Sequence, residues 1–440
     1  MQLPQAFLER IRSYLSEDDY NAFVSSYDTA PEKGIRLNTM KCSREKFEEL
    51  LGDSINPSPF SEKSYYIGDD FKVGTNPLHS AGAFYAQEPS ASSAVTVLDP
   101  QPGEYILDMC AAPGGKSTQI AAQMQGEGIL FSNEVVKSRA NILLSNVERM
   151  GIKNCVVTSS FPEKYAQILP EFFDRIMVDA PCSGEGMFRK NNDAITEWSP
   201  EHVETCAVRQ RAILNDAATC LKPGGIMVYS TCTFSKEENE DTVKHFLETH
   251  DDFELVPIEV NFGRQGLDNL PVLRIFPMDG GEGHFVAKFR KKGELLPNIP
   301  YMQKKQGKQE AEILREIARI TTEQWGNIFI NKDKIYLHPV GLPDLKGLNV
   351  LRAGVLFGEM LKNRIEPAHQ FFMAADPDKI INKLDLSYDS RDLNKFYHGE
   401  EIPCECRGYT AVCVEGITTG FGKASGGMLK NKYPKGLRHN

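Results

Sequence analysis

The stretch Glu104-Tyr105-Ile106-Leu107-Asp108-Met109 leads directly into the turn Cys110-Ala111-Ala112-Pro113-Gly114-Gly115-Lys116, and a predicted helix begins at Ser117. A strand, a glycine-rich turn and a helix N-terminus let the backbone approach a ligand and aim N–H groups at it. The turn lacks the Walker A pattern, because Cys110 stands where that pattern needs a glycine, and it also lacks the G-x-G-x-x-G pattern. These differences favour S-adenosylmethionine over ATP or NAD as the ligand.

The residues that follow this turn alternate between apolar, strand-like runs and helical stretches. Five predicted strands are centred on Ile106, Leu130, Val156, Met177 and Val228. From Val136 to Val147 the apolar residues recur at helical spacing, and Gly151 is a stop signal. This alternation predicts a parallel, doubly wound α/β sheet. The runs Leu273–Phe276 and His284–Phe289 flank a glycine-rich turn and predict an antiparallel hairpin, which is the pattern of class I methyltransferases.

A carboxylate lies at the end of the second of these strands. Glu134 follows the apolar run 128–133, at a position where an acidic side chain can accept hydrogen bonds from both hydroxyls of a ribose. A glutamate at a strand end is common and means little alone, so this prediction depends on the neighbouring turn.

Two cysteines follow predicted strands in similar contexts, as Asp179-Ala180-Pro181-Cys182 and Ser230-Thr231-Cys232. The carboxyl ends of parallel strands line one crevice, so both thiols are expected to face the pocket beside the turn. Such a pair suits covalent catalysis: a thiolate that adds to C6 of a cytosine turns C5 into a nucleophile for a sulfonium methyl group. Two alternatives to a catalytic role exist for these cysteines. They could be small apolar residues of the core, or they could form a disulfide, which a reducing cytoplasm disfavours.

The overall composition is that of a soluble globular protein. The chain has 440 residues, of which 41% are hydrophobic and 25% charged, enough for two or three domains. No apolar run of about 18 residues predicts a membrane span, and the N-terminal residues lack the features of a signal peptide. The ten cysteines are too sparse for a disulfide scaffold and form no complete zinc set, so we expect a cytoplasmic protein without a metal.

The charge is unevenly distributed. The net charge of −10 argues against a general nucleic-acid coat protein, but residues 416–440 contain five lysines or arginines and no acidic residue. Local basic patches of this kind suit phosphate binding, although a solvated basic tail is an equal alternative.

Three motifs together resemble the Rsm/Nop/NSUN family of RNA 5-methylcytosine methyltransferases over roughly residues 30–290. They are Asp108-Met109-Cys110-Ala111-Ala112-Pro113-Gly114-Gly115-Lys116-Ser117-Thr118, Asp179-Ala180-Pro181-Cys182-Ser183-Gly184-Glu185-Gly186 and Tyr229-Ser230-Thr231-Cys232-Thr233. Beyond them, Leu351-Arg352-Ala353-Gly354 and Gly420-Phe421-Gly422-Lys423 are similar to the RsmF (YebU) subgroup. The resemblance implies S-adenosylmethionine as the cofactor, bacterial 16S rRNA as the substrate and a C-terminal PUA-like RNA-binding region.

The resemblance also implies a role for each motif residue. Cys232 is implied to be the nucleophile at C6, and Cys182 to assist proton removal or release of the methylated base. Asp179 is implied to contact cofactor and base, with Lys116 near the active site. The implied cofactor-binding residues are Cys110, Ala111, Ala112, Pro113, Gly114, Gly115, Lys116, Glu134, Arg139, Ser160 and Asp179.

One position departs from the family pattern. After the third strand many relatives carry Asp or Glu to receive the adenine amino group, whereas this chain has Ser159-Ser160. Ser160 is therefore expected to bind adenine in place of the acid.

Five residues are expected to contact RNA. Arg36 and Asn38 match the family's RNA-facing Arg-x-Asn element, and Arg189 and Lys190 are positioned to touch phosphates, as is Lys423 near the C-terminus. For Arg189 and Lys190, ordinary surface charge is the alternative.

The expected architecture is an α/β class I (Rossmann-like) methyltransferase sheet with an α+β N-terminal domain and a C-terminal PUA-like RNA-binding region. The expected divisions are an N-terminal RNA-binding domain (1–92), a methyltransferase domain (93–292), a basic linker (293–312), an intermediate domain (313–374) and a PUA-like domain (375–440).

The favoured function is formation of 5-methylcytosine in 16S rRNA by a covalent cysteine–C6 adduct. The expected partner is 16S rRNA or the small ribosomal subunit, with no membrane and a monomeric enzyme. Three alternatives remain open: the same chemistry on tRNA or large-subunit rRNA, an RNA-binding assembly factor without catalysis, and a DNA target. The presence of both cysteines disfavours the second, and the intact Thr-Cys motif disfavours the third.

Overall fold

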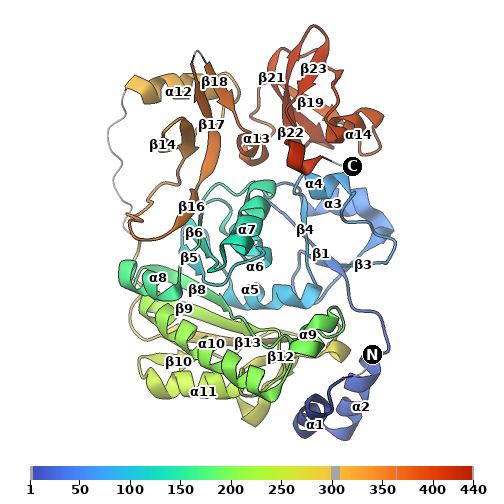
Figure 1. Cartoon of the computed structure of the whole chain (residues 1–440), viewed down its shortest axis with the longest axis vertical. Coiled ribbons are helices and arrows are strands. Elements are labelled where there is room, and N and C mark those ends of the chain that lie inside the picture. Colours follow the sequence, from blue (N-terminus) through green and yellow to red (C-terminus); the bar gives the residue numbers. More distant parts are fainter. Residues whose placement is uncertain (1–2, 299–307, 363, 439–440) are drawn as a thin grey trace.

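The computed structural model describes residues 3–298, 308–362 and 364–438, and a ten-stranded sheet lies at its centre (Figure 1). Nine strands follow the order β11-β12-β13-β9-β8-β5-β6-β7-β16, and β10 pairs with β13. The five predicted strands pair in parallel, and they are β5 (Tyr105–Asp108), β6 (Ile129–Asn133), β7 (Cys155–Thr158), β8 (Phe173–Asp179) and β9 (Leu221–Thr231). Successive residues of β5, β6 and β7 are buried on both faces, which explains their continuous apolar character.

The predicted hairpin is confirmed. β12 (Leu273–Ile275) pairs antiparallel with β13 (His284–Lys291), and β13 pairs antiparallel with β9. Two short strands, β10 (Phe253–Leu255) and β11 (Arg264–Gln265), also pair at this side of the sheet. An antiparallel strand inserted beside the last parallel strand is the class I arrangement, so the expected fold class is confirmed.

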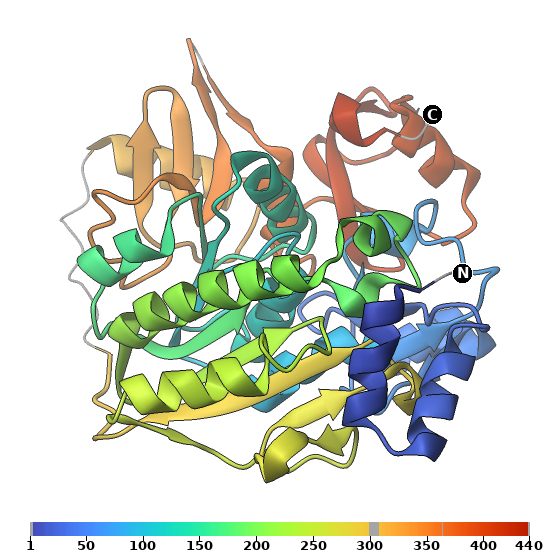
Figure 2. The same ribbon diagram turned by 60° about the horizontal axis from the view of Figure 1, so that its bottom comes forward.

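Helices cover both faces of the central sheet. One face carries α8 (Pro162–Ile168), α10 (Pro200–Cys220) and α11 (Glu240–Thr249), and the other carries α5 (Ser93–Leu98), α6 (Gly115–Met124) and α7 (Lys137–Arg149). Figure 2 shows α10 and α11, in green, along the near face. Leu214 and Phe246 belong to the core on this face, and Val95 and Ile120 to the core on the opposite face. The sheet between these cores brings the carboxyl ends of β5, β6, β8 and β9 to one edge.

The N-terminal region contains two helices and a small sheet. α1 (Gln5–Tyr14) and α2 (Glu17–Ser26) precede an antiparallel sheet with the order β2-β3-β1-β4. Its elements are β1 (Gly34–Leu37), α3 (Arg44–Leu51), β2 (Ile55–Pro57), β3 (Ser64–Ile67), α4 (Pro77–Ser80) and β4 (Phe84–Ala86). Phe7 of α1 and Phe23 of α2 pack with Phe188, Trp198 and Phe234 in one aromatic cluster. The first two helices thus support the loops that follow β8 and β9.

Two elements of the structure cross the expected boundaries of the segment after the central domain. α12 (Lys308–Ala318) begins inside the predicted linker 293–312, and residues 299–307 of that linker lie outside the described residues. The helix forms there because Ile313 and Ile317 are buried in an apolar core that also contains Phe357 and Phe371. In addition, β16 (Val350–Ala353) pairs antiparallel with β7 and extends the central sheet.

Two more sheets complete the C-terminal part. The first has the order β14-β15-β17-β18 and the second the order β19-β21-β22-β23-β20. The first contains β14 (Ile328–Asn331), β15 (Lys334–Leu337), β17 (Val355–Leu361) and β18 (Arg364–Pro367), followed by α13 (His369–Ala374). The second contains β19 (Lys383–Leu386), α14 (Arg391–His398), β20 (Ile402–Pro403), β21 (Gly408–Val414), β22 (Ile417–Ser425) and β23 (Met428–Asn431).

The last sheet packs against the first part of the chain. Phe396 and Leu429 share one apolar core with Ile35 and Phe84 of the N-terminal sheet. Figure 1 shows the same neighbourhood, with α3 and α4 below β22. No helix within the described ranges is long and apolar enough to cross a membrane.

Candidate active site

The glycine-rich turn at the end of β5 is held by bonds to its neighbours. The Ala111 N–H donates to the Asn133 carbonyl oxygen at 2.7 Å, and the Arg139 guanidinium donates to the Ala112 carbonyl oxygen at 3.1 Å. Gly114 has a φ of 116°, in the left-handed region that favours glycine, and it caps the N-terminus of α6. The Ser117 hydroxyl anchors the first turn of α6 by donating to the Asp108 carboxylate at 2.6 Å.

A cavity of about 290 Å³ lies beside this turn. Residues 110–113, 115 and 116 form one part of its lining. Asp179, Cys232, Met187, Lys190 and His284 also line it. Of the residues predicted to face one pocket with the turn, Asp179 and Cys232 line this cavity, whereas Cys182 contacts Cys232 but is not among the lining residues.

The two predicted thiols are in contact. Sγ of Cys182 lies 3.0 Å from Sγ of Cys232, and both cysteines are free and partly exposed. The hydrogen bond with Cys232, together with burial, raises the pKa of Cys182 well above its ordinary value. Cys182 therefore keeps its proton at neutral pH, and a proton shared with Sγ of Cys232 can stabilise negative charge there.

An ion pair lies beside the thiols. Nζ of Lys116 lies 2.8 Å from Oδ2 of Asp179, and the Ser230 hydroxyl donates to Oδ1 of Asp179 at 2.7 Å. Burial opposes the charge on Lys116, but the charge of Asp179, the hydrogen bond to it and a smaller effect of Cys232 outweigh burial and raise the pKa of Lys116. The cavity thus contains a fixed cation, a fixed carboxylate and a thiol.

The buried carboxylate of Glu185 connects the two cysteine loops. It accepts hydrogen bonds from the Trp198 indole N–H at 2.8 Å, the Thr233 hydroxyl at 2.8 Å, the Phe234 N–H at 2.7 Å and the Ser235 hydroxyl at 2.6 Å. Because three of these donors follow Cys232 and Glu185 follows Cys182, the carboxylate holds the two loops at a set separation.

Glu238 makes a second connection between the same loops. Its carboxylate accepts from the Ser183 N–H at 3.0 Å and from the Gln210 amide at 2.7 Å, and the Ser183 hydroxyl also donates to it. Burial raises the pKa of Glu238 to about 7. Glu185 and Glu238 are the residues that we call the loop carboxylates.

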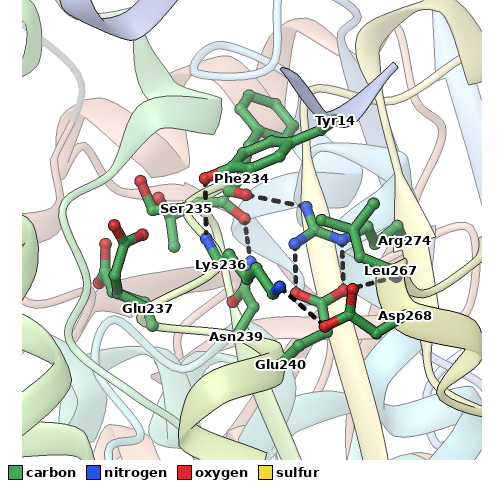
Figure 3. Close-up of polar contacts among 12 residues, drawn as sticks. Tyr14, Phe234, Ser235, Lys236, Glu237, Asn239, Glu240, Leu267, Asp268 and Arg274 are labelled. Carbon is green, nitrogen blue, oxygen red and sulfur yellow. Dashed lines mark hydrogen bonds and ion pairs between the residues drawn. The ribbon is translucent and has the colours of Figure 1, made fainter. Parts of the chain in front are cut away.

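Contacts from outside the central strands also fix the loop after Cys232 (Figure 3). Arg274 of β12 donates to the buried Glu240 carboxylate at 2.7 Å and to the Phe234 carbonyl oxygen at 2.9 Å. The Tyr14 hydroxyl of α1 accepts from the Lys236 N–H at 3.4 Å. The loop that presents Cys232 is therefore braced by the hairpin and by the first helix.

The remaining predicted cofactor residues lie at the ends of β6 and β7. Oε2 of Glu134 lies 3.2 Å from Nη1 of Arg139, and Oε1 accepts from the Val136 N–H at 2.9 Å. The Ser160 hydroxyl oxygen accepts from the Asn349 N–H at 2.9 Å, so the segment before β16 occupies part of the space beside Ser160. The Ser160 hydroxyl hydrogen takes no part in that bond, and Ser160 is buried, with 6% of its area exposed.

Three of the residues expected to contact RNA are enclosed, which corrects those predictions. Arg36 is 2% exposed, and its guanidinium donates to Thr118 Oγ1 at 2.6 Å. Asn38 is 1% exposed and donates to the carbonyl oxygens of Gly82 and Met150. The Arg189 side chain pairs with Glu282 at 3.2 Å with only 4% of its area exposed.

The partners of Arg36, Asn38 and Arg189 come from distant segments of the chain. The sequence around these three residues therefore does not show that their side chains are buried. Lys190 lines the cavity, and Lys423 is exposed and lies 5.3 Å over the ring of Tyr409.

Sequence reasoning missed the loop carboxylates and His284. Glu185 stands inside the second motif, but its spacing gives no sign of its four donors. Glu238 lies in the run Lys236-Glu237-Glu238-Asn239-Glu240, which has the composition of a solvated surface. No cluster of three or more His, Cys, Asp or Glu side chains that could hold a metal occurs in the described parts of the chain.

Family models match four consecutive parts of the chain. The model described as 16S rRNA methyltransferase RsmB/F matches residues 95–290, and the N-terminal domain of 16S rRNA methyltransferase RsmF matches residues 3–89. The RsmF rRNA methyltransferase first C-terminal domain matches residues 313–374, and the methyltransferase RsmF PUA domain matches residues 383–439. These matches agree with the expected N-terminal, central and PUA-like parts of the fold.

Individual relatives give the same result. Ribosomal RNA small subunit methyltransferase F of Vibrio campbellii is 34% identical over 469 residues, covering 99% of this chain and 97% of the relative. The protein of the same name from Escherichia coli O7:K1 is 34% identical over 467 residues, covering 99% and 96%. A solved structure of a methyltransferase homolog protein from Pyrococcus horikoshii is 29% identical, with a TM-score of 0.59 over 66% of this chain and 95% of that chain.

Proposed function

The chain belongs to the RsmF family of 16S rRNA methyltransferases, and we propose that it forms 5-methylcytosine in 16S rRNA through a covalent bond between Cys232 and C6 of the target base. The observation that carries this proposal is the contact of Cys182 with Cys232 at 3.0 Å, beside the Lys116–Asp179 ion pair. Two thiols in contact, one of which lines the cavity, suit a reaction with one step that forms a covalent adduct and one that resolves it.

The residues around the turn fit S-adenosylmethionine as the methyl donor. Backbone N–H groups at the N-terminus of α6 suit the methionine carboxylate, and Glu134 offers a carboxylate to the ribose hydroxyls. Phe161 is 59% exposed and Val135 is 37% exposed, and such apolar side chains can flank an adenine ring. When bound, S-adenosylmethionine supplies an electrophilic methyl group on a positively charged sulfur.

We assign the first bond-forming step to Cys232. Its thiolate forms a bond to C6, and the electron pair of the C5–C6 double bond would form the new bond from C5 to the methyl carbon, whose bond to the sulfonium sulfur would break with its electron pair left on that sulfur. The proton of Cys182 stabilises the thiolate before this attack. We assign Asp179, which Lys116 and Ser230 hold in place, to the N3 edge of the base, where it would stabilise the adduct.

The second step reverses the adduct. The C5 proton leaves to a base, the C5–C6 double bond forms again, and the C6–S bond breaks to return the Cys232 thiolate. We assign Cys182 to assist this step, because its sulfur contacts the sulfur that leaves. Its context, Pro181-Cys182, is the part of the second motif for which the family resemblance implies this role.

The partner that we propose is 16S rRNA or the small ribosomal subunit, reached in the cytoplasm. The target base must leave its stack to enter the cavity, and Lys190 and Lys423 are the exposed cations that we assign to phosphates. We propose RNA-binding roles for the N-terminal region (1–92) and for the PUA domain, which precede and follow the catalytic region in the sequence and pack against each other in the structure. Their shared apolar core supports a fixed spacing between these regions.

The loop carboxylate Glu185 gives a prediction about catalysis. In Glu185→Gln one acceptor oxygen becomes a donor, so at least one of the four donors in this buried site loses its partner. We expect kcat to fall at least tenfold and the unfolding free energy to fall by roughly 2 kcal/mol, while the cofactor Kd stays unchanged. Steady-state kinetics, thermal unfolding and calorimetric titration measure the three quantities.

Glu204→Gln, on an exposed part of α10, is the matched control and should leave all three at wild-type values. A Glu185→Gln enzyme with wild-type kcat would show that the separation of the loops does not depend on this carboxylate.

Bisulfite sequencing of rRNA and tRNA from cells with and without this gene tests the proposed function. We expect loss of 5-methylcytosine at one or a few 16S positions, with restoration by the wild-type gene. Loss in tRNA or in large-subunit rRNA would keep the chemistry and overturn the substrate. No change in any RNA would favour an assembly factor without catalysis.

A further inference from the structure

A histidine lines the cavity and has no role in the chemistry described above. His284 is the first residue of β13, and it lines the cavity together with Asp179 and Cys232. In the register of β13 with β9, the last pair is Phe285 with Thr231, and His284 and Cys232 are the residues next to that pair. Because both also line the same cavity, His284 lies near the residue that we assign as the nucleophile.

The hydrogen bonds of His284 determine which ring nitrogen carries the proton. Nδ1 lies 3.0 Å from the Ser90 hydroxyl oxygen, and that hydroxyl donates its one hydrogen to Oε2 of Glu88 at 2.6 Å. The Ser90 oxygen must therefore accept from Nδ1, which carries the ring hydrogen. Nε2 is then an acceptor with a lone pair.

The surroundings keep the ring in this neutral form. Glu88 also accepts from the N–H groups of Ser90 and Ala91, so its carboxylate is fixed behind Nδ1. Burial lowers the pKa of His284 to about 4, with Lys116 and Lys190 among the charges that lower it and Glu88 and Asp179 among those that raise it. Both contacts of His284 in the described part of the chain use Nδ1, which leaves Nε2 to the cavity.

We propose that Nε2 of His284 accepts a hydrogen bond from the exocyclic amino group of the target cytosine and so selects cytosine over uracil. The inference rests on the proposed function, since it concerns the base that Cys232 attacks. Cytosine presents a donor at N4, whereas uracil presents an acceptor at O4, which would face the lone pair of Nε2. A site built to bond a polar group rejects an analogue that lacks it more strongly than an apolar site does.

The test compares substrates that differ at one group of the base. An RNA fragment that spans the mapped 16S position carries cytidine, uridine or a pyrimidin-2-one nucleoside, which lacks the amino group. We expect His284→Phe to slow methylation of the cytidine fragment about tenfold and to leave the pyrimidin-2-one fragment unchanged. His284→Gln should keep most of the preference for cytidine, because its amide oxygen can accept at a similar distance.

The ratio of the two rates is measured within each variant, so a general loss of stability does not change it. His284→Asn, with a shorter amide, should lose the preference as His284→Phe does, and it replaces that variant if the phenylalanine form does not fold. If His284→Phe or His284→Asn slowed both fragments equally, or slowed neither, the proposal would be overturned. Failure of the wild-type enzyme to methylate the cytidine fragment would instead contradict the function on which the inference rests.

Discussion

Replacing Cys232 with alanine is expected to reduce methylation of 16S rRNA by more than about 10³-fold, because Cys232 is the residue to which we assign the bond to C6. The cofactor Kd should stay at its wild-type value, since the turn 110–116 is held by Asn133, Arg139 and Ser117 rather than by Cys232. Methyl transfer to small subunits from cells that lack the gene measures the first quantity, and calorimetric titration measures the second.

Two controls make this result specific. Cys406→Ala changes a partly exposed cysteine in the loop between β20 and β21 and should leave turnover unchanged. The melting temperature of Cys232→Ala should remain close to that of the wild type, because its thiol is partly exposed and its contact is with the thiol of Cys182. Substantial turnover by Cys232→Ala would contradict the roles assigned to both cysteines.

The parts of the fold that the sequence predicted are those encoded by local patterns. The five parallel strands, the turn after Asp108 and the hairpin before Lys291 each depend on a short apolar run and a glycine-rich connection. The positions of the two thiols could be predicted for the same reason, since both follow strands whose carboxyl ends meet at one edge. The distance of 3.0 Å between the two sulfur atoms could not be predicted, because the loop carboxylates connect the two cysteine loops through contacts between distant segments.

The features that sequence reasoning missed depend on partners from distant segments. Arg36 is enclosed by Thr118 of α6, and Arg189 by Glu282, so a basic residue that suited RNA became an internal contact. β16 joins the central sheet from a region with no strand–helix rhythm, and its pairing with β7 becomes evident only in three dimensions. The tautomer of His284 likewise depends on Ser90 and Glu88, far away in the sequence.

Replacing Cys182 with alanine is expected to trap the covalent intermediate, whereas Cys232→Ala prevents that intermediate from forming. With Cys232 intact the bond to C6 can still form, but the step that breaks it loses the thiol in contact with the leaving sulfur. We therefore expect an RNA–protein adduct that survives denaturing electrophoresis and requires S-adenosylmethionine for full yield. Multiple turnover should fall by more than about 10²-fold, since the enzyme remains bound to its product.

The double variant Cys182→Ala/Cys232→Ala separates the two roles. It should form no adduct, because the trapped bond belongs to Cys232. Cys182→Ser should release part of the adduct, since a hydroxyl at this position can still exchange a proton near the leaving sulfur. If Cys182→Ala turned over without any adduct, proton removal and release would have to depend on another group. The carboxylate of Asp179, which lines the cavity with Cys232 and pairs with Lys116 at 2.8 Å, would then be a candidate. The two single variants together thus test whether contact between the sulfurs corresponds to successive steps of one reaction.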